Sequence, residues 1–229
     1  MTTALFRPVR TGNAFEETVE RLLQAIRLGV VGPGERLPAG RELAARLGVS
    51  RVTLREALKS LQDAGFVESR RGRYGGTFVA AALPRAPAGG APQEDIDDVL
   101  TLREVLETGA AAAAADRALT PQVRRHLRSC LDDCAAADPG EYRRRDSRLH
   151  LAVAEATGSP SLVSAVADVR SKVNLMLDAI PLLTPNIEHS DAQHAAIVTA
   201  ILDGNPTAAS LAMTEHLAGT AALLRGFLS

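Results

Sequence analysis

Four side chains in the second half of the chain are of the types that bind transition metals. Asp146 and His150 lie four residues apart in a helical pattern, so both point to the same side of one helix. His194 shares the apolar face of the segment HAAIVTAI, and His216 lies among apolar residues of the last helical pattern. One carboxylate and three imidazoles that converge inside a helical bundle can bind a divalent ion such as Zn, Ni, Mn or Fe and leave coordination positions open. The residues therefore predict a metal centre.

Other interpretations of these four residues stay open. A single histidine is more often a core or surface residue than a ligand, and His126 and His189 are expected at the surface. Three histidines with one aspartate also occur in metal-dependent hydrolases and oxygenases. The sequence has no HExxH pair and no obvious general base beside the four residues, so we do not expect an enzyme.

Arg103, in the segment LREVLE, can interact with a carboxylate in two ways. A guanidinium can grip the carboxylate of a bound organic acid in two places. The alternative is an ion pair with Glu107, one helical turn further on, which would contribute little at a surface.

The elements that position these side chains are predicted to be helices. A capping residue followed by proline, the combination that starts a helix, recurs at Thr120-Pro121, Asp138-Pro139, Ser159-Pro160, Thr184-Pro185 and Asn205-Pro206. With the long segment at 93–118, these starts delimit about six helices, and no convincing strand pattern separates them. We expect an all-α bundle.

Residues 34–79 predict a different architecture, in which two short helices precede a hairpin. Only three residues join the helical patterns at 41–47 and 51–64. Gly48 can adopt the left-handed conformation that ends the first helix, and Ser50 can accept a hydrogen bond from the amides that open the second. A tight turn between the helices is therefore expected.

The second of these helices has a basic face and an apolar stripe. Arg51, Arg55 and Lys59 lie one turn apart and should face outward. The stripe, expected to be buried, consists of Val52, Leu54, Ala57, Leu58 and Leu61. A basic run is usually only a solvated face, but arginines at the start of a helix that follows a tight turn favour DNA binding.

Flanking segments complete a winged helix-turn-helix. An amphipathic helix at 14–28, ended by Gly29, should brace the helix pair. Gly65 stops the second helix, and strands that start at Phe66 and Thr77 should form a hairpin, the wing.

Residues 14–80 resemble the DNA-binding domain of the GntR superfamily of bacterial transcription factors. The resemblance lies in PGERLP at 33–38, RELAARLGVSR at 41–51, TLREAL at 53–58 and the wing RGxxGGTFV. Ala39 and Gly40 stand where the family usually has Ser-Glu. The resemblance implies that the DNA-binding residues are Arg41, Arg51, Thr53, Arg55 and Gly72.

The second half resembles the ligand-sensing (FCD) domain of the FadR-type branch of that superfamily. The shared segments are LTLREVLETGAAAAA at 100–114, DSRLHLAVAEATGSP at 146–160 and HAAIVTAILDGNPTAASLAMTEHL at 194–217. Leu149 stands where the family commonly has Phe. The resemblance implies a metal on the Asp and three His residues described above and a carboxylate effector bound by Arg103.

Composition and charge support two domains of different character. The 229 residues are 46% hydrophobic and carry a net charge of −1. Residues 1–83 carry 13 Lys and Arg against 8 Asp and Glu, whereas 84–229 carry 13 against 19. A basic first part suits contacts with phosphates. We predict a DNA-binding domain at 1–80, a Pro-, Ala- and Gly-rich linker at 81–92, and a sensing and dimerisation domain at 93–229.

Cysteine usage and hydropathy bear on the compartment. Cys130 and Cys134 are four apart in a helical pattern, a poor geometry for a disulfide, so free thiols in a reducing cytosol are expected. No signal peptide and no apolar run long enough to cross a bilayer is present in this sequence. The expected location is the cytoplasm, with no membrane partner.

These observations predict a mainly α protein, a winged helix-turn-helix followed by an all-α sensing bundle. The expected function is a ligand-responsive transcriptional regulator that binds double-stranded operator DNA as a homodimer. Family resemblance favours a repressor released by a small carboxylate effector. The alternatives are a metal-dependent enzyme and an architectural DNA-binding dimer without an effector.

Overall fold

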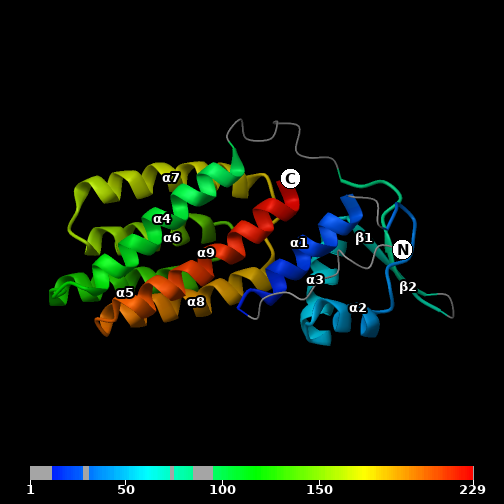
Figure 1. The fold of residues 1–229 in the computed structure, drawn as a ribbon, viewed down its shortest axis with the longest axis horizontal. Coiled ribbons are helices and arrows are strands. Elements are labelled where there is room, and N and C mark those ends of the chain that lie inside the picture. The colour runs from blue at the N-terminus through cyan, green and yellow to red at the C-terminus, as the bar shows by residue number, and fades with distance from the viewer. Residues whose placement is uncertain (1–11, 28–30, 73–74, 85–94, 229) are drawn as a thin grey trace. The chain divides into compact units, whose positions relative to one another are not determined.

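The computed structural model describes residues 12–27, 31–72, 75–84 and 95–228 (Figure 1). Gly29 and most of the expected linker lie outside the described residues. The described residues form two compact units. The first unit comprises the described residues within Met1–Ala91, Ala179–Asn186 and Gly219–Ser229. The second unit comprises those within Pro92–Asp178 and Ile187–Ala218. The expected domain boundaries stay a prediction.

The first unit contains three helices and a two-stranded antiparallel sheet within residues 12–84. Their bounds are α1 (Ala14–Arg27), α2 (Gly40–Leu47), α3 (Arg51–Asp63), β1 (Val67–Arg70) and β2 (Gly76–Val79). Helix α1 packs against α3 and buries its apolar face, which consists of Phe15, Val19, Leu22, Leu23 and Ile26. The expected bracing helix is therefore confirmed.

The turn between α2 and α3 forms as the sequence predicts. Gly48 ends α2 in the left-handed conformation, with φ 68°, where a Cβ would be strained. The Ser50 hydroxyl accepts a hydrogen bond of 3.0 Å from the Thr53 amide and so caps α3. Ala39 precedes α2 without a side-chain capping bond.

The buried stripe of α3 is narrower than expected. Leu54, Ala57 and Leu61 are buried, and Leu58 is half-buried. The expectation that Val52 is buried is wrong, because 52% of this residue is exposed. At 3.6 residues per turn, Val52 lies about 160° around the helix from Leu54 and so faces away from the core.

The wing follows α3 directly. Gly65, with φ 79°, directs the chain out of α3. Strand β1 then pairs with β2 from Val67↔Val79 to Arg70↔Gly76. The hairpin is confirmed, with the first strand beginning at Val67 and the second at Gly76 rather than at Phe66 and Thr77.

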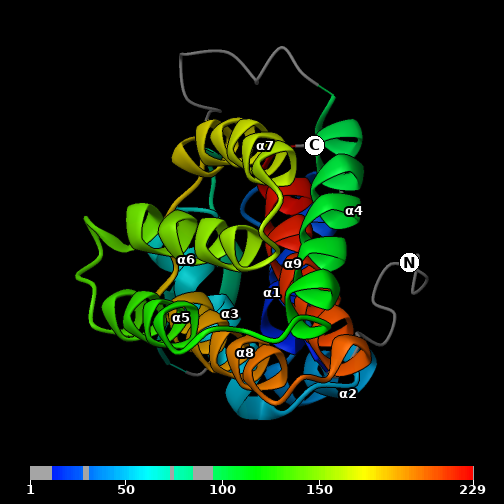
Figure 2. The same cartoon turned by 90° about the vertical axis from the view of Figure 1, so that its left-hand side faces the viewer.

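Six helices follow within residues 95–228, and these residues form no strand (Figure 2). They are α4 (Ile96–Ala115), α5 (Pro121–Ala135), α6 (Tyr142–Ala156), α7 (Pro160–Asp178), α8 (Thr184–Leu202) and α9 (Pro206–Leu228). Thr120, Ser159 and Asn205 accept capping hydrogen bonds at the starts of α5, α7 and α9. The expected all-α bundle is therefore confirmed, and no described helix is long and apolar enough to cross a membrane.

One of the expected helix starts is wrong. Asp138 and Pro139 form a turn, and α6 begins only at Tyr142. The Asp138 carboxylate accepts from the amides of Gly140 and Glu141, at 2.9 and 3.0 Å, and this closes a turn rather than capping a helix at Pro139. The start predicted at Thr184-Pro185 is displaced by one residue, because α8 begins at Thr184 itself and not at Pro185.

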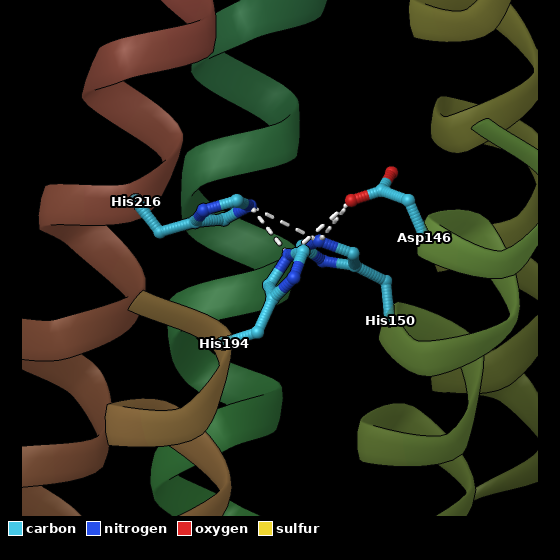
Figure 3. A group of neighbouring side chains, drawn as sticks. All are labelled: Asp146, His150, His194 and His216. Atoms are coloured by element: carbon cyan, nitrogen blue, oxygen red, sulfur yellow. Dashed lines mark hydrogen bonds and ion pairs between the residues drawn. The ribbon is translucent and has the colours of Figure 1, made fainter. Parts of the chain in front are cut away.

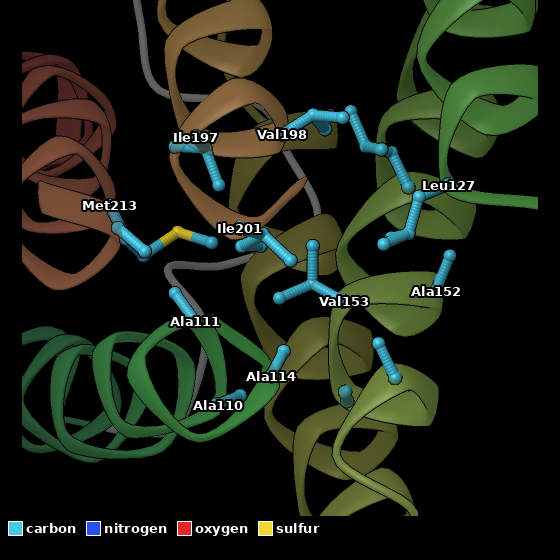
Figure 4. Close-up of a cluster of buried hydrophobic side chains, with 14 of the residues drawn as sticks. Ala110, Ala111, Ala114, Leu127, Ala152, Val153, Ile197, Val198, Ile201 and Met213 are labelled. Atoms are coloured by element: carbon cyan, nitrogen blue, oxygen red, sulfur yellow. The ribbon is translucent and has the colours of Figure 1, made fainter. Parts of the chain in front are cut away.

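The core of the second unit combines small side chains on α4 with large ones on its neighbours (Figure 4). Ala110, Ala111 and Ala114 are almost fully buried on α4. Branched and long side chains fill the space opposite these alanines, including Leu127, Val153, Ile197, Ile201 and Met213. Close packing of this kind fixes the backbones of the helices and hence the direction of their polar side chains. Cys130 and Cys134 are buried free thiols, as expected.

Candidate metal centre and nucleic-acid interface

The four predicted metal ligands meet in the interior of the second unit (Figure 3). Helix α6 supplies Asp146 and His150, α8 supplies His194, and α9 supplies His216. All four residues are buried, and at most 8% of any one is exposed. One ligand atom from each residue lies within 4.8 Å of the other three.

The spacing of the ligand atoms is that of a set sharing one ion. Asp146 Oδ1 lies 3.5 Å from His150 Nε2 and 3.3 Å from His194 Nε2. His216 Nε2 lies 3.3 Å from His194 Nε2 and 3.2 Å from His150 Nε2. Ligands held about 2.0–2.1 Å from a tetrahedral zinc ion are separated by roughly 3.3–3.4 Å. Four of the six separations therefore match ligands that share one ion, and all six are at most 4.8 Å.

The outer nitrogen of each histidine ring has a partner that orients the inner nitrogen. His150 Nδ1 contacts the Glu107 carboxylate, and His216 Nδ1 lies 3.3 Å from Gln193 Oε1. Both oxygens accept a hydrogen bond, so in a neutral ring they place the proton on Nδ1 and a lone pair on Nε2. This is the tautomer that binds metal through Nε2.

His194 has a different outer environment. Its Nδ1 lies 3.9 Å from both the Cys134 sulfur and Asp191 Oδ1, and the Tyr142 hydroxyl donates a 3.3 Å hydrogen bond to Asp191. Three ring nitrogens from three helices thus turn toward one point beside a carboxylate oxygen. An apolar core alone gives no reason for this arrangement.

The charges of the cluster also suit a cation. Burial alone would raise the pKa of Asp146, but Arg170 and His150 outweigh it and hold that pKa well below its ordinary value. Burial, together with the neighbouring His194 and His150 rings, holds the pKa of His216 well below its ordinary value. Burial would also lower the pKa of His194, but hydrogen bonds to Asp146 and Asp191 raise it well above the ordinary value. A cation that bound His194 through Nε2 would compete with a proton for that nitrogen.

Two buried arginines border the cluster. Arg103 on α4 is 1% exposed and donates a 3.0 Å hydrogen bond from Nε to Glu107, so the predicted ion pair exists but lies in the interior. Arg170 on α7 is 2% exposed and contacts Asp146 Oδ2. Arg103 Nη1, Arg170 Nε and Arg170 Nη1 are buried without a hydrogen-bond partner among the described residues. Such unpaired donors are costly in a protein interior.

Arg170 and the link between Glu107 and His150 were not predicted from the sequence. The only available indication for Glu107 was its four-residue spacing from Arg103. The space beside the histidines is small, a cavity of about 10 Å³ bordered by Leu149, His194 and Met213 among others. Any organic ligand must displace side chains to enter.

The first unit carries a groove of about 750 Å³ between α2, α3 and the wing. Of the predicted DNA-binding residues, Arg41, Arg51 and Arg55 are exposed and line this groove. Thr53 is half-buried, and its hydroxyl lies 2.8 Å from that of Ser50 in the helix cap. Gly72 is exposed in the wing loop with φ 103°, a conformation that favours glycine. Val52 and Lys59 also line the groove.

A basic groove on a winged helix-turn-helix, in a chain whose second unit is a helical bundle, defines a class of DNA-binding regulators. Residues 15–79 match the family described as "Bacterial regulatory proteins, gntR family", and residues 98–219 match the family described as "FCD domain". The chain therefore belongs to the GntR family of bacterial transcriptional regulators, in its branch with an FCD domain, and is not an enzyme.

Two relatives of the chain are named as regulators of operons. It is 33% identical over 216 residues to the "Putative L-lactate dehydrogenase operon regulatory protein" of Escherichia coli K12, covering 88% of this chain and 83% of that protein. It is 31% identical to the Uxu operon transcriptional regulator of the same organism, covering 81% and 76%. The solved structure of E. coli McbR/YncC covers 92% of this chain and 96% of that one at a TM-score of 0.51. At 21% identity this likeness shows the fold alone.

Proposed function

We propose that this regulator is a metal-containing sensor of a small carboxylate and represses its operon until the carboxylate binds. The single observation that carries the proposal is the cluster of Asp146, His150, His194 and His216, whose inner atoms lie 3.2–3.5 Å from their neighbours. Imidazole with carboxylate suits Zn, Ni, Mn or Fe. A bound ion would supply a Lewis acid to which a carboxylate oxygen coordinates.

The buried arginines support a carboxylate as effector. Arg103 Nη1 and Arg170 Nη1 lack hydrogen-bond partners among the described residues, and each belongs to a guanidinium next to the cluster. A carboxylate that accepted from either nitrogen would satisfy a donor that now costs stability. A neutral effector without an acceptor would leave these donors unpaired.

Entry of an effector would be coupled to movement of the helices. The cavity at the histidines, about 10 Å³, holds no more than about one water, so a carboxylate of even a few carbon atoms must displace packed side chains. Close-packed cores respond to such insertions by shifts of whole elements rather than by continuous deformation. Operator affinity would change when these shifts reach the DNA-binding domain.

Operator binding would use Arg41, Arg51, Thr53, Arg55 and Gly72, the residues implied by the family resemblance. The three arginines line one groove, which supports this set. A single recognition helix reads few base pairs, so we expect a homodimer on a palindromic site, acting in the cytoplasm where the operator lies. The chain would then divide functionally into a DNA-binding domain at 1–80, a linker at 81–92 and a sensing domain at 93–229.

Operator release by carboxylates tests the effector part of the proposal. An operator would be selected from a random duplex library, and its release followed by fluorescence anisotropy with a panel of carboxylates that includes L-lactate, chosen because a relative is named for an L-lactate dehydrogenase operon. Arg170→Lys keeps the positive charge beside Asp146 but removes the two-pronged guanidinium. This variant should therefore retain the metal and lose operator release by the carboxylate. Arg128→Lys, an exposed change on α5, should respond like the parent.

Two outcomes would contradict the proposal. If Arg170→Lys responded at the same carboxylate concentration as the parent, the effector would bind elsewhere. If no carboxylate released the operator from metal-loaded parent protein, the alternative of an architectural DNA-binding dimer without an effector would be favoured.

A further inference from the structure

Val52 is exposed at a place where an apolar side chain has no role in the fold. It is the second residue of α3, and 52% of it is exposed. Among the described residues of the first unit, Val52 and Leu182 are the exposed large hydrophobic residues, and Val52 is the more exposed of the two. A scattered exposed valine needs no explanation elsewhere, but this one lines the basic groove with Arg51 and Arg55.

The neighbours of Val52 point to DNA as the surface that covers it. The first turn of a recognition helix enters the major groove and reads base edges. The groove that Val52 lines also contains Leu54, Leu58 and the basic residues of α3, Gly40 from α2, and Ser69 and Thr77 from the wing. Apolar area exposed in such a groove is removed from water when the groove is covered.

Only one group on the base edges of the major groove is apolar, the 5-methyl group of thymine. Guanine offers two acceptors, adenine an acceptor and a donor, and cytosine a donor. Valine has neither donor nor acceptor, so any of these polar groups placed against it would lose its hydrogen bonds with water. The β-branched side chain is also stiff, which fixes the direction of its methyl groups.

From this we infer that Val52 is a specificity-determining residue that selects a thymine in each operator half-site through its methyl group. The inference rests on the proposed use of α3 for DNA recognition. Arg51 and Val52 both lie in the first turn of α3, so the thymine and the base contacted by Arg51 belong to the same half-site. Since Arg pairs best with guanine, that half-site also contains a guanine.

The test replaces each thymine of the selected operator by deoxyuridine, which removes the methyl group and keeps the base pairing. Burial of one methyl group contributes about 0.8 kcal/mol, so a substitution in one half-site should weaken binding by the parent about fourfold, and substitutions in both half-sites about 15-fold. Val52→Ala should bind the thymine and uridine operators equally. Because Val52 is exposed, this variant should melt at the same temperature as the parent.

Two control variants separate the methyl contact from DNA binding in general. Lys59→Ala removes a charge from the same groove, so it should weaken binding to both operators by the same factor and keep the preference for thymine. Arg51→Ala should lose about 1–3 kcal/mol of specific binding if α3 is the recognition helix.

The outcomes distinguish the inference from the function on which it rests. If no thymine-to-uridine change alters the dissociation constant, or if Val52→Ala keeps the thymine preference of the parent, the inference is wrong. If Arg51→Ala still loses specific binding in that case, the use of α3 stands. If Arg51→Ala and Val52→Ala both bind as the parent does, the proposed docking of α3 fails as well.

Discussion

Glu107→Gln should weaken metal binding without replacing any of the four proposed metal ligands. Glu107 is 2% exposed, contacts Nδ1 of His150, and accepts a 3.0 Å hydrogen bond from Arg103. Burial alone would raise the pKa of Glu107, but His150 and Arg103 outweigh it and hold that pKa below its ordinary value. The ionised carboxylate therefore fixes the His150 tautomer and increases the basicity of Nε2.

The size of the effect follows from the hydrogen bond that is weakened. A hydrogen bond to a charged group contributes about 1.5–3 kcal/mol, which corresponds to about a 10–100-fold change in affinity at about 1.4 kcal/mol per tenfold. Loss of an outer-shell partner of a metal-bound histidine has the same typical cost, about 10–100-fold. Glutamine keeps the shape and an acceptor oxygen, so the helices should stay in place.

Metal affinity would be measured by competition with a chromophoric chelator, on the full chain and at fixed pH. Glu155→Gln is the matched control, because Glu155 pairs at the surface with Arg148 at 2.7 Å, and its loss should leave metal affinity unchanged. A Glu107→Gln protein that folds and binds metal within threefold of the parent would refute the assigned role of Glu107.

Further predictions concern DNA, protons and stability. Arg55→Ala should lose about 1–3 kcal/mol of specific operator binding, whereas Arg128→Ala should lose none. Operator affinities would be measured by fluorescence anisotropy at one salt concentration. Equal affinities for the parent and both variants would contradict the assignment of the α3 groove to DNA binding. Because the pKa of His194 is raised, metal binding should release about one proton per chain, and affinity should fall as pH falls. Calorimetric heats that do not depend on the ionisation enthalpy of the buffer would argue against this release. Added metal should raise the melting temperature of the parent but not of His216→Ala, and an equal rise in both would exclude His216 as a ligand.

The sequence predicted those features that depend on local spacing. Gly48 and Ser50 fixed the turn of the helix pair through backbone conformation and capping, which act within a few residues. Part of the Asp and His cluster was predictable for a similar reason, since Asp146 and His150 share a helix face. The meeting of these two residues with His194 and His216, from α8 and α9, was implied by the family resemblance. Asp138 was misassigned because the same side chain can either cap a helix or close a turn.

Features that depend on packing between distant segments were not predictable. His150 and its partner Glu107 are 43 residues apart in sequence, and Arg170 and Asp146 are 24 apart. No local pattern indicates that α4 and α7 place their charged side chains beside α6. Val52 was wrongly predicted to be buried because it is an apolar residue on a helix with a buried stripe. In the structure it faces the groove and not the core.

The central claim is that the Asp and His cluster binds a metal on which the response to a carboxylate depends. The most direct measurement is elemental analysis of the purified chain, combined with carboxylate titration of its operator complex before and after removal of the metal. The account predicts about one divalent ion per chain and a response that is lost with the ion and returns when it is restored. A chain that holds no metal after purification and reconstitution, yet releases its operator at the same carboxylate concentration, would contradict the claim.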